Sequence, residues 1–274
     1  MLTSTNSIMA QTESDSTVLR PVWSAYTLSS GSSHIADTYL SPIKYAGWTV
    51  GFGYNRLQSM KFSPERWIMQ LRFNLDASCS KNQAKNTDIW YAGINFSWGM
   101  MYRWKLPYGL SAGVGGSAMI DLGCLYLSRN GNNPASAKAA ATLNATGYIT
   151  YKTHLWSLPI TLRYQPTLPV IGAFFSPDYN ELYYEIFLGN RSGLAHCAWF
   201  GNFFRLDNLL TADLNFGNTS LRIGYSANFH STKVNDIVTH NYTHCAIVGI
   251  SGEWISLNPN KRISPAAKII SATF

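Results

Sequence analysis

A run of ten residues, Trp67 to Asp76, most narrows what this chain can fold into. Its sequence, WIMQLRFNLD, places a bulky apolar residue at each odd position and a polar residue at each even position after Ile68. Successive side chains of an extended chain point to opposite faces. The run therefore predicts a β-strand with one apolar face and one polar face.

The same alternation recurs along the chain and predicts about ten strands. The connections between them alternate short and long, which is typical of bacterial barrels with short periplasmic turns and longer extracellular loops. Both chain ends are then periplasmic, and twelve strands result if the longest connection contains a hairpin. The predicted strands lie at about residues 17–28, 47–60, 67–76, 90–104, 109–126, 137–152, 160–165, 210–216, 221–230 and 238–252.

Several segments between these strands are predicted as loops, at residues 29–46, 79–87 and 128–136. The longest, 165–208, is rich in aromatic residues, which argues against disorder. A loop of this length is usually functional, and we expect an ordered insertion that caps the barrel mouth or plugs the lumen. The Ala-rich start of 137–152 also allows a helix. The tail 253–274 is either a terminal strand or an assembly signal.

Composition favours a membrane barrel over a soluble one. Charged residues make up 13% of the chain, about half the usual fraction of a soluble domain. The Trp- and Phe-rich face is too bulky for the interior of a barrel this narrow, and the polar face lacks the Lys and Glu of a soluble surface. Aromatic residues at the strand ends suit the two membrane interfaces, namely Trp48, Trp67, Trp90, Tyr102, Trp104, Tyr151 and Trp156.

The predicted fold is thus all-β, a transmembrane antiparallel up-and-down β-barrel in the outer membrane of a Gram-negative bacterium. The lipid bilayer and lipopolysaccharide would surround it. Residues 1–11 resemble the remnant of a signal peptide, with SIMA before Gln11, so residues 12–274 form a single barrel domain. The chain contains no run of 18 or more apolar residues, so no transmembrane helix is predicted.

Other partners are not expected. The net charge of +7 comes from scattered Lys and Arg rather than a basic run, so nucleic acid is a poor candidate. Four cysteines without C-x-x-C spacing predict no metal site, and no cofactor is predicted. In an exported protein, Cys79 and Cys124 could form a disulfide across extracellular loops. His240 and His244 share one strand face and could bind a metal only with ligands from elsewhere.

Four stretches resemble an outer-membrane barrel family of unknown function from Bacteroidetes-type bacteria. They are TYLSP at 38–42, RNGNNP at 129–134, and the runs 163–175 and 188–196. The likeness extends over most of residues 37–274, and the Pro-rich insertion is its most specific part. It implies the same fold and location, and it implies no catalytic residue and no substrate.

Charged residues on the polar face are the first candidate functional set. Charges lining a lumen set the selectivity of pores, although the same residues could instead pair and stabilise the lumen. The corresponding hypothesis is a passive barrel, either a narrow channel or a lumen that binds a small solute. The residues assigned to this face are Arg56, Arg72, Arg103, Arg163 and Arg222, with Asp76, Asp121 and Asp213 as partners.

Two other hypotheses compete with the passive barrel. An outer-membrane hydrolase acting on lipid or peptide would use His196 with Ser192, oriented by Asp178 or Glu185, and Arg191 lies in the same segment. Such a set needs hydrogen-bond contact, and Ser192 does not lie in a G-x-S-x-G motif. We therefore expect no enzyme. The third hypothesis is a structural subunit that binds a partner in an envelope complex.

Overall fold

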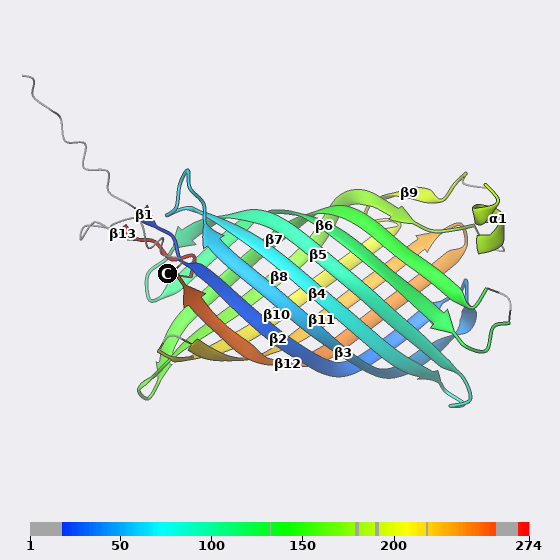
Figure 1. Cartoon of the computed structure of the whole chain (residues 1–274), viewed down its shortest axis with the longest axis horizontal. Helices are drawn as coiled ribbons and strands as arrows, with labels where there is room; N and C mark the ends of the chain where they lie inside the picture. Colours follow the sequence, from blue (N-terminus) through cyan, green and yellow to red (C-terminus); the bar gives the residue numbers. More distant parts are fainter. Residues whose placement is uncertain are drawn as a thin grey trace, which may run out of the picture.

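The computed structural model describes residues 18–131, 133–178, 181–189, 192–217, 219–255 and 268–273. Ten long strands form a closed antiparallel barrel, in which each strand pairs with its neighbours along the chain and the last pairs with the first (Figure 1). The strands are β2 (Val22–Asp37), β3 (Ser41–Ser59), β4 (Trp67–Asn82), β5 (Asp88–Lys105), β6 (Leu110–Leu127), β7 (Ala135–Leu155), β8 (Leu158–Phe175), β10 (Phe203–Phe216), β11 (Thr219–Val234) and β12 (Ile237–Trp254).

The bulky face of each strand lies on the outside of the barrel. Its members are exposed, whereas the polar residues between them are buried in the lumen. The strands contain 14 to 21 residues, more than the roughly 9–11 needed to cross a bilayer. An apolar exterior around a polar lumen is the arrangement of a transmembrane β-barrel, so the predicted fold class is confirmed. Outward residues include Trp48, Val50, Phe52, Trp90, Ile94, Phe96, Trp98 and Ile120.

Aromatic side chains form a row near each end of this apolar surface. At one end, Trp48, Trp90 and Tyr126 belong to one register row across β3 to β6. At the other, Trp67 meets Tyr102 edge-on, with ring centroids 5.4 Å apart. Tryptophan and tyrosine favour membrane–water interfaces, so the two rows mark the limits of the bilayer.

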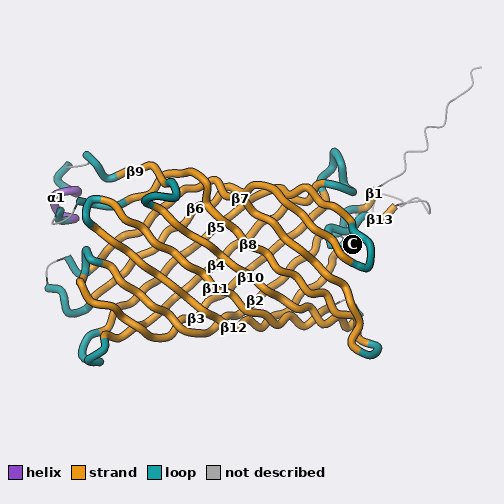
Figure 2. Tube along the Cα trace, turned by 180° about the vertical axis from the view of Figure 1, so that it is seen from behind, coloured by secondary structure: helices purple, strands orange, loops and turns teal. Residues whose placement is uncertain are grey.

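The two ends of the barrel differ in their connections (Figure 2). One end has the turns 60–66, 106–109, 156–157 and 217–218 and both described chain ends, and the tight last turn uses Gly217 at φ +85°. The other has the turns 38–40, 83–87, 128–134 and 235–236 and the segment 176–202, which contains α1 (Tyr183–Phe187) and β9 (Ala195–Ala198). Longer connections face outward in bacterial barrels, so we name the two ends periplasmic and extracellular.

Two predicted loops are wrong in extent. Residues 29–46 belong mostly to β2 and β3, which join at 38–40, and β4 continues to Asn82. The strand ends next to the turns lie beyond the aromatic row, and Ser29 to Gly31 pair with Gly51 to Thr49 just inside it. Hydrophobic alternation fades there while backbone pairing continues, which is why the sequence resembled a loop.

The predicted insertion at 165–208 is also wrong in extent, since it is shortened at both ends. β8 continues to Phe175 despite Pro166 and Pro169, with a register shift in its pairing to β7 that leaves Val170 unpaired. A bulge of this kind accommodates an extra residue. The remaining segment, 176–202, lies at the extracellular rim, where β9 pairs with the end of β8 (Figure 1). The insertion is therefore a cap on the rim rather than a plug.

The structure can also be compared with several smaller predictions. The start of β7 is strand, not helix. All four cysteines are free, and β5 separates the strands of Cys79 and Cys124. The described residues include no helix with the length and hydrophobicity needed to span a bilayer. Residues 1–11, assigned to a signal-peptide remnant, lie outside the described residues.

The C-terminal tail is not a barrel strand. β13 (Lys268–Ile269) pairs in parallel with β1 (Val18–Leu19) at the periplasmic end. The residues that follow it are buried, and Ala272 packs into the lumen against Trp23 and Tyr148. The tail thus contributes to closing the periplasmic mouth.

Apolar clusters fill both ends of the lumen. At the periplasmic end the cluster consists of Trp23, Ala25, Leu57, Ile68, Met101, Tyr148 and Ala272. At the extracellular end it consists of Ile35, Leu40, Tyr45, Ile89, Leu125 and Leu127. The polar part of the lumen lies between them.

Candidate functional site

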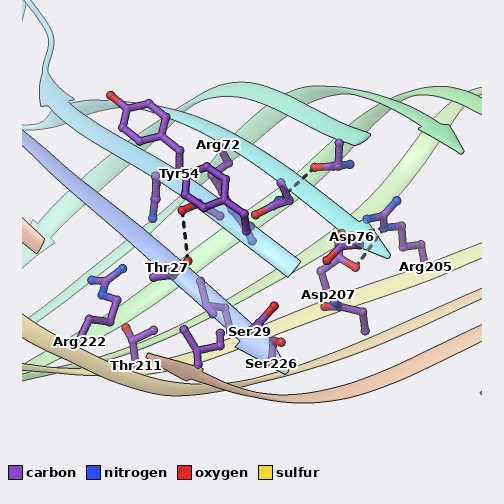
Figure 3. Close-up of a pocket in the computed structure, with 18 residues that line it drawn as sticks. Thr27, Ser29, Tyr54, Arg72, Asp76, Arg205, Asp207, Thr211, Arg222 and Ser226 are labelled. Atoms are coloured by element: carbon purple, nitrogen blue, oxygen red, sulfur yellow. Dashed lines mark hydrogen bonds and ion pairs between the residues drawn. The ribbon is translucent and has the colours of Figure 1, made fainter. Parts of the chain in front are cut away.

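An ion-paired cluster crosses the lumen in its extracellular half. The Arg205 guanidinium, from β10, contacts Asp121 on β6 at 2.9 Å and Asp207 at 3.0 Å. Asn95 extends the network, donating to Asp121 at 3.3 Å. Asp76 faces the same space without a hydrogen bond or ion pair of its own in the described part of the chain (Figure 3). Three carboxylates therefore surround one paired arginine.

A second ion pair lies nearer the periplasmic end. Asp213 and Arg222 face each other across β10 and β11 and form a bidentate pair at 2.7 and 2.6 Å. Ser251 donates to the same carboxylate at 2.9 Å, and the guanidinium lies 4.5 Å from the ring centroid of Trp23. Both carboxylate oxygens of Asp213 and two guanidinium nitrogens of Arg222 are hydrogen-bonded, so this pair is a structural element of the lumen wall.

Two glutamines form the constriction between these ion pairs. Gln70 on β4 and Gln165 on β8 exchange amide hydrogen bonds of 3.1 and 2.6 Å. Three strands separate β4 from β8 around the barrel, so the two side chains meet across the lumen. Asn55 accepts a further bond from Gln70 at 3.0 Å. Both glutamines are buried, and their contact closes the pathway.

Two arginines flank this constriction without a carboxylate partner. Arg72 is the next inward residue on the extracellular side of Gln70, and Arg163 is the next inward residue on the periplasmic side of Gln165. Arg163 donates to Gln165 at 3.3 Å and lies 4.2 Å from the ring centroid of Tyr148. Among the described residues neither arginine forms an ion pair. The narrowest part of the lumen therefore carries two unneutralised positive charges.

Lumen space remains on both sides of the constriction. Two small cavities of about 90 and 60 Å³ lie around the Arg205 cluster and share Asp76, Asp207 and Ser226 in their walls. Arg72 lines the larger of the two (Figure 3). Below the constriction a vestibule of about 730 Å³ opens, with Arg163 and the tail in its wall. Between the two apolar clusters the pathway is polar, and the two glutamines interrupt it in this state.

The predicted lumen residues are placed as follows. Arg72, Asp76, Asp121, Arg163, Asp213 and Arg222 face the lumen. Arg103 also points inward, but it binds the tail and a turn, donating to the carbonyl oxygens of Ser271, Glu65 and Pro64. The assignment of Arg56 is wrong, because it has the same strand parity as Trp48 and Tyr54 and bonds Gln58 on the outer wall.

The predicted loop residues have structural contacts. The Nε2 of His196 hydrogen-bonds the backbone carbonyl of Ser176 at 3.0 Å. Asp178 accepts from Asn235, and Glu185 accepts from the backbone N–H of Leu182 at the start of α1, at 3.1 Å. Arg191 lies outside the described residues, and Ser192 is exposed.

The two histidines of β12 lie on the outer wall. His240 and His244 contact the hydroxyls of Tyr242 and Tyr225 at 3.1 and 2.6 Å. The described residues contain no group of three or more His, Cys, Asp or Glu placed to hold a metal ion.

Four lumen residues were missed as functional candidates, namely Arg205, Asp207, Gln70 and Gln165. The first two fell in the predicted insertion. Extending the polar alternation of Asp213 and Thr211 backwards reaches both of them, so the signal was present. For the glutamines, the sequence shows inward position but not that residues 95 apart meet.

Solved structures with a similar architecture include several barrels. They include the transport unit of the autotransporter AIDA-I from Escherichia coli, with 9% identity, 92% of this chain and 95% of that chain covered, and a TM-score of 0.48. The COG4313 outer membrane channel from Pseudomonas putida F1 has 10% identity, coverage of 88% and 98%, and a TM-score of 0.35. We draw nothing about function from similarity at this level.

Sequence comparison places the chain in a family. No curated protein sequence matches it. A family model described as "Protein of unknown function (DUF3316)" matches residues 1–261, nearly the full length. The chain belongs to this family of unknown function.

Proposed function

We propose that this protein is an outer-membrane barrel of a Gram-negative, Bacteroidetes-type bacterium that conducts small anionic solutes through its lumen. The observation that carries the proposal is the pair of unneutralised arginines, Arg72 and Arg163, on either side of the Gln70–Gln165 constriction. Rings of Arg or Lys are the usual basis of anion preference in pores. Selectivity is set where the pathway is narrowest, and there the charge is positive.

The other lumen charges support this assignment. The Asp213–Arg222 pair is electrically balanced and bidentate. The carboxylates around Arg205 lie on the extracellular side of the Gln70–Gln165 contact, outside the narrowest part of the lumen. A solute entering from the vestibule therefore meets Arg163 first and Arg72 after the glutamines. Cavities of 60 to 90 Å³ admit only a small solute, and its passage requires the two amides to separate.

Solute flux into liposomes containing the purified full-length chain tests this function. Chloride and small carboxylates are expected to enter faster than potassium. In Arg72→Gln/Arg163→Gln this preference should disappear. The matched control is Arg56→Gln/Arg66→Gln, which removes two arginines outside the lumen and should leave the preference intact. Equal loss of preference in both double variants would show that surface charge, not the constriction, determines it.

A third variant tests the constriction itself. Gln70→Ala/Gln165→Ala removes the amides that meet across the lumen and should raise flux while preserving the preference for anions. If flux stays at the level of empty liposomes in this variant, the conducting function is wrong.

We further infer that the extracellular cap is not a hydrolase site. The contacts that support this are those of His196, whose Nε2 is held by the Ser176 carbonyl, and of Glu185, which caps α1. His196→Ala should leave any lipid or peptide hydrolysis by the purified protein unchanged. A loss of turnover in that variant would reverse the assignment.

A second candidate function has one observation in its favour. The cap exposes large apolar side chains, with Tyr184, Phe187 and Leu188 exposed on or next to α1. Exposed apolar patches often mark contact surfaces, so the cap suits a partner in an envelope complex. Cross-linking through a cysteine at Phe187 in intact cells tests it. Recovery of the monomer alone would exclude a stable partner at this surface.

A further inference from the structure

A groove on the outer wall of the barrel is not explained by conduction through the lumen. It has a volume of about 820 Å³ and runs across β12, β2, β3 and β4 near the extracellular end. Small residues, Ala36, Ala46 and Gly47, line it beside the large ring of Trp48. Because Ala46 and Trp48 point outward from the barrel, the groove opens to the surroundings and not to the lumen.

The polar side chains of this groove carry one sign of charge. Lys44, Lys81 and Lys85 line it, together with His34 and His240, and no carboxylate does. All three lysines are exposed.

Protein carboxylates do little to neutralise these lysines. Lys81 has a loose pair with Asp88 at 3.7 Å, in which both side chains are more than a third exposed. Such pairs contribute little. Lys44 and Lys85 have no ion pair within the described residues. The groove therefore presents uncompensated positive charge next to an apolar wall.

The position of the groove along the barrel axis fits the outer leaflet of the membrane. Trp48 belongs to the extracellular aromatic row with Trp90 and Tyr126, and such rows lie at the level of lipid headgroups. The lysines lie at or beyond this row, on the approaches to the turns 38–40 and 83–87. Lysines at this depth extend toward charged headgroups. Trp48, the part of the apolar wall nearest the middle of the barrel, lies at this row, where the headgroups meet the acyl chains.

We propose that this groove binds a phosphorylated lipid of the outer leaflet. Its phosphate contacts Lys44, Lys81 and Lys85, and one acyl chain lies over Ala46 against Trp48. Both halves of the groove are needed for such a ligand, since free phosphate would leave the apolar wall uncovered and an uncharged lipid would leave the lysines unpaired.

Native mass spectrometry of the full-length protein in detergent tests the site, with hexa-acylated lipid A carrying two phosphates as the probe. The variant is Lys44→Gln/Lys81→Gln/Lys85→Gln. Each Lys near an anionic lipid surface contributes enough that losing three should weaken binding by roughly tenfold or more. The control Lys61→Gln/Arg66→Gln/Lys105→Gln removes three exposed charges at the periplasmic end and should bind like the wild type. Equal binding of lipid A by the wild type and by the variant without the three groove lysines would overturn the proposal.

A second variant separates seating in the groove from general charge attraction. Ala46→Trp fills the groove without changing charge, and it should weaken lipid A binding as well. Unchanged binding in Ala46→Trp would mean that the lysines act without the groove, which contradicts the proposal. Inorganic phosphate at millimolar concentration should not displace the lipid. Displacement would identify a phosphate site in place of a lipid site.

Discussion

The Arg205 cluster allows a stability prediction with an internal control. The side chains of Arg205, Asp121 and Asp207 are only 12–13% exposed, and the guanidinium bonds both carboxylates at about 3 Å. Arg205→Gln would leave these carboxylates together with Asp76 and without a cation bonded to them. Removing one partner of a buried pair typically costs about 3–5 kcal/mol. We expect a loss of roughly 3 kcal/mol in the free energy of unfolding, the lower end of this range, because the three side chains are not completely buried.

Arg72→Gln is the matched control, since Arg72 lines the same cavity and has no bonded carboxylate in the described structure. Its loss should cost less than about 1 kcal/mol. The assay is reversible urea unfolding from lipid vesicles, followed by the fluorescence of the nine tryptophans. Arg205→Gln/Asp121→Asn/Asp207→Asn should recover most of the stability, because no unpaired charge remains at the pair. Equal destabilisation by Arg205→Gln and Arg72→Gln would refute the reasoning.

Two further predictions concern the tail. Arg103→Met removes the hydrogen bonds to Ser271 and to the turn 60–66, so the tail should become sensitive to carboxypeptidase. Continued protection of the tail would contradict the role of Arg103 in holding it. The Lys268 ammonium bonds Glu65 and lowers the pKa of that carboxyl. The stabilisation from this contact is therefore complete above the usual carboxyl pKa and is lost as pH falls through the lowered pKa of Glu65. Glu65→Gln should therefore increase tail cleavage at pH 7, and this effect should disappear as pH falls through the lowered pKa of Glu65. An effect that is the same at every pH would be inconsistent.

The membrane-spanning parts of the strands could be predicted from sequence because lipid and lumen impose opposite polarity on neighbouring residues. Trp90 to Trp104 shows this alternation with only Tyr91 and Met101 out of phase. Ser29 to Ser33 looked like a loop because the run SSGSS has no bulky apolar residue on either face, although its backbone still pairs with β3. Pro166 and Pro169 acted as false boundaries, because β8 accommodates them with a register shift.

The candidate site was only partly predictable. The alternation of side chains between the two faces of a strand correctly placed Arg72, Arg163 and Arg222 in the lumen. The same rule, applied consistently, would have placed Arg56 outside. This alternation does not show which inward residues meet across the lumen. The contact of Gln70 with Gln165 depends on barrel closure between β12 and β2 and on the strand tilt, which no local pattern specifies.

The central claim is that positive charge at the constriction selects anions. The most direct measurement is the reversal potential of single channels in a planar bilayer under a tenfold KCl gradient, for the full chain and for Gln70→Ala/Gln165→Ala. A potential displaced toward the chloride equilibrium value, and lost when Arg72 and Arg163 are both changed to Gln, is the expected result. A potential near the potassium equilibrium value, or no conductance even with the glutamines removed, would contradict the claim.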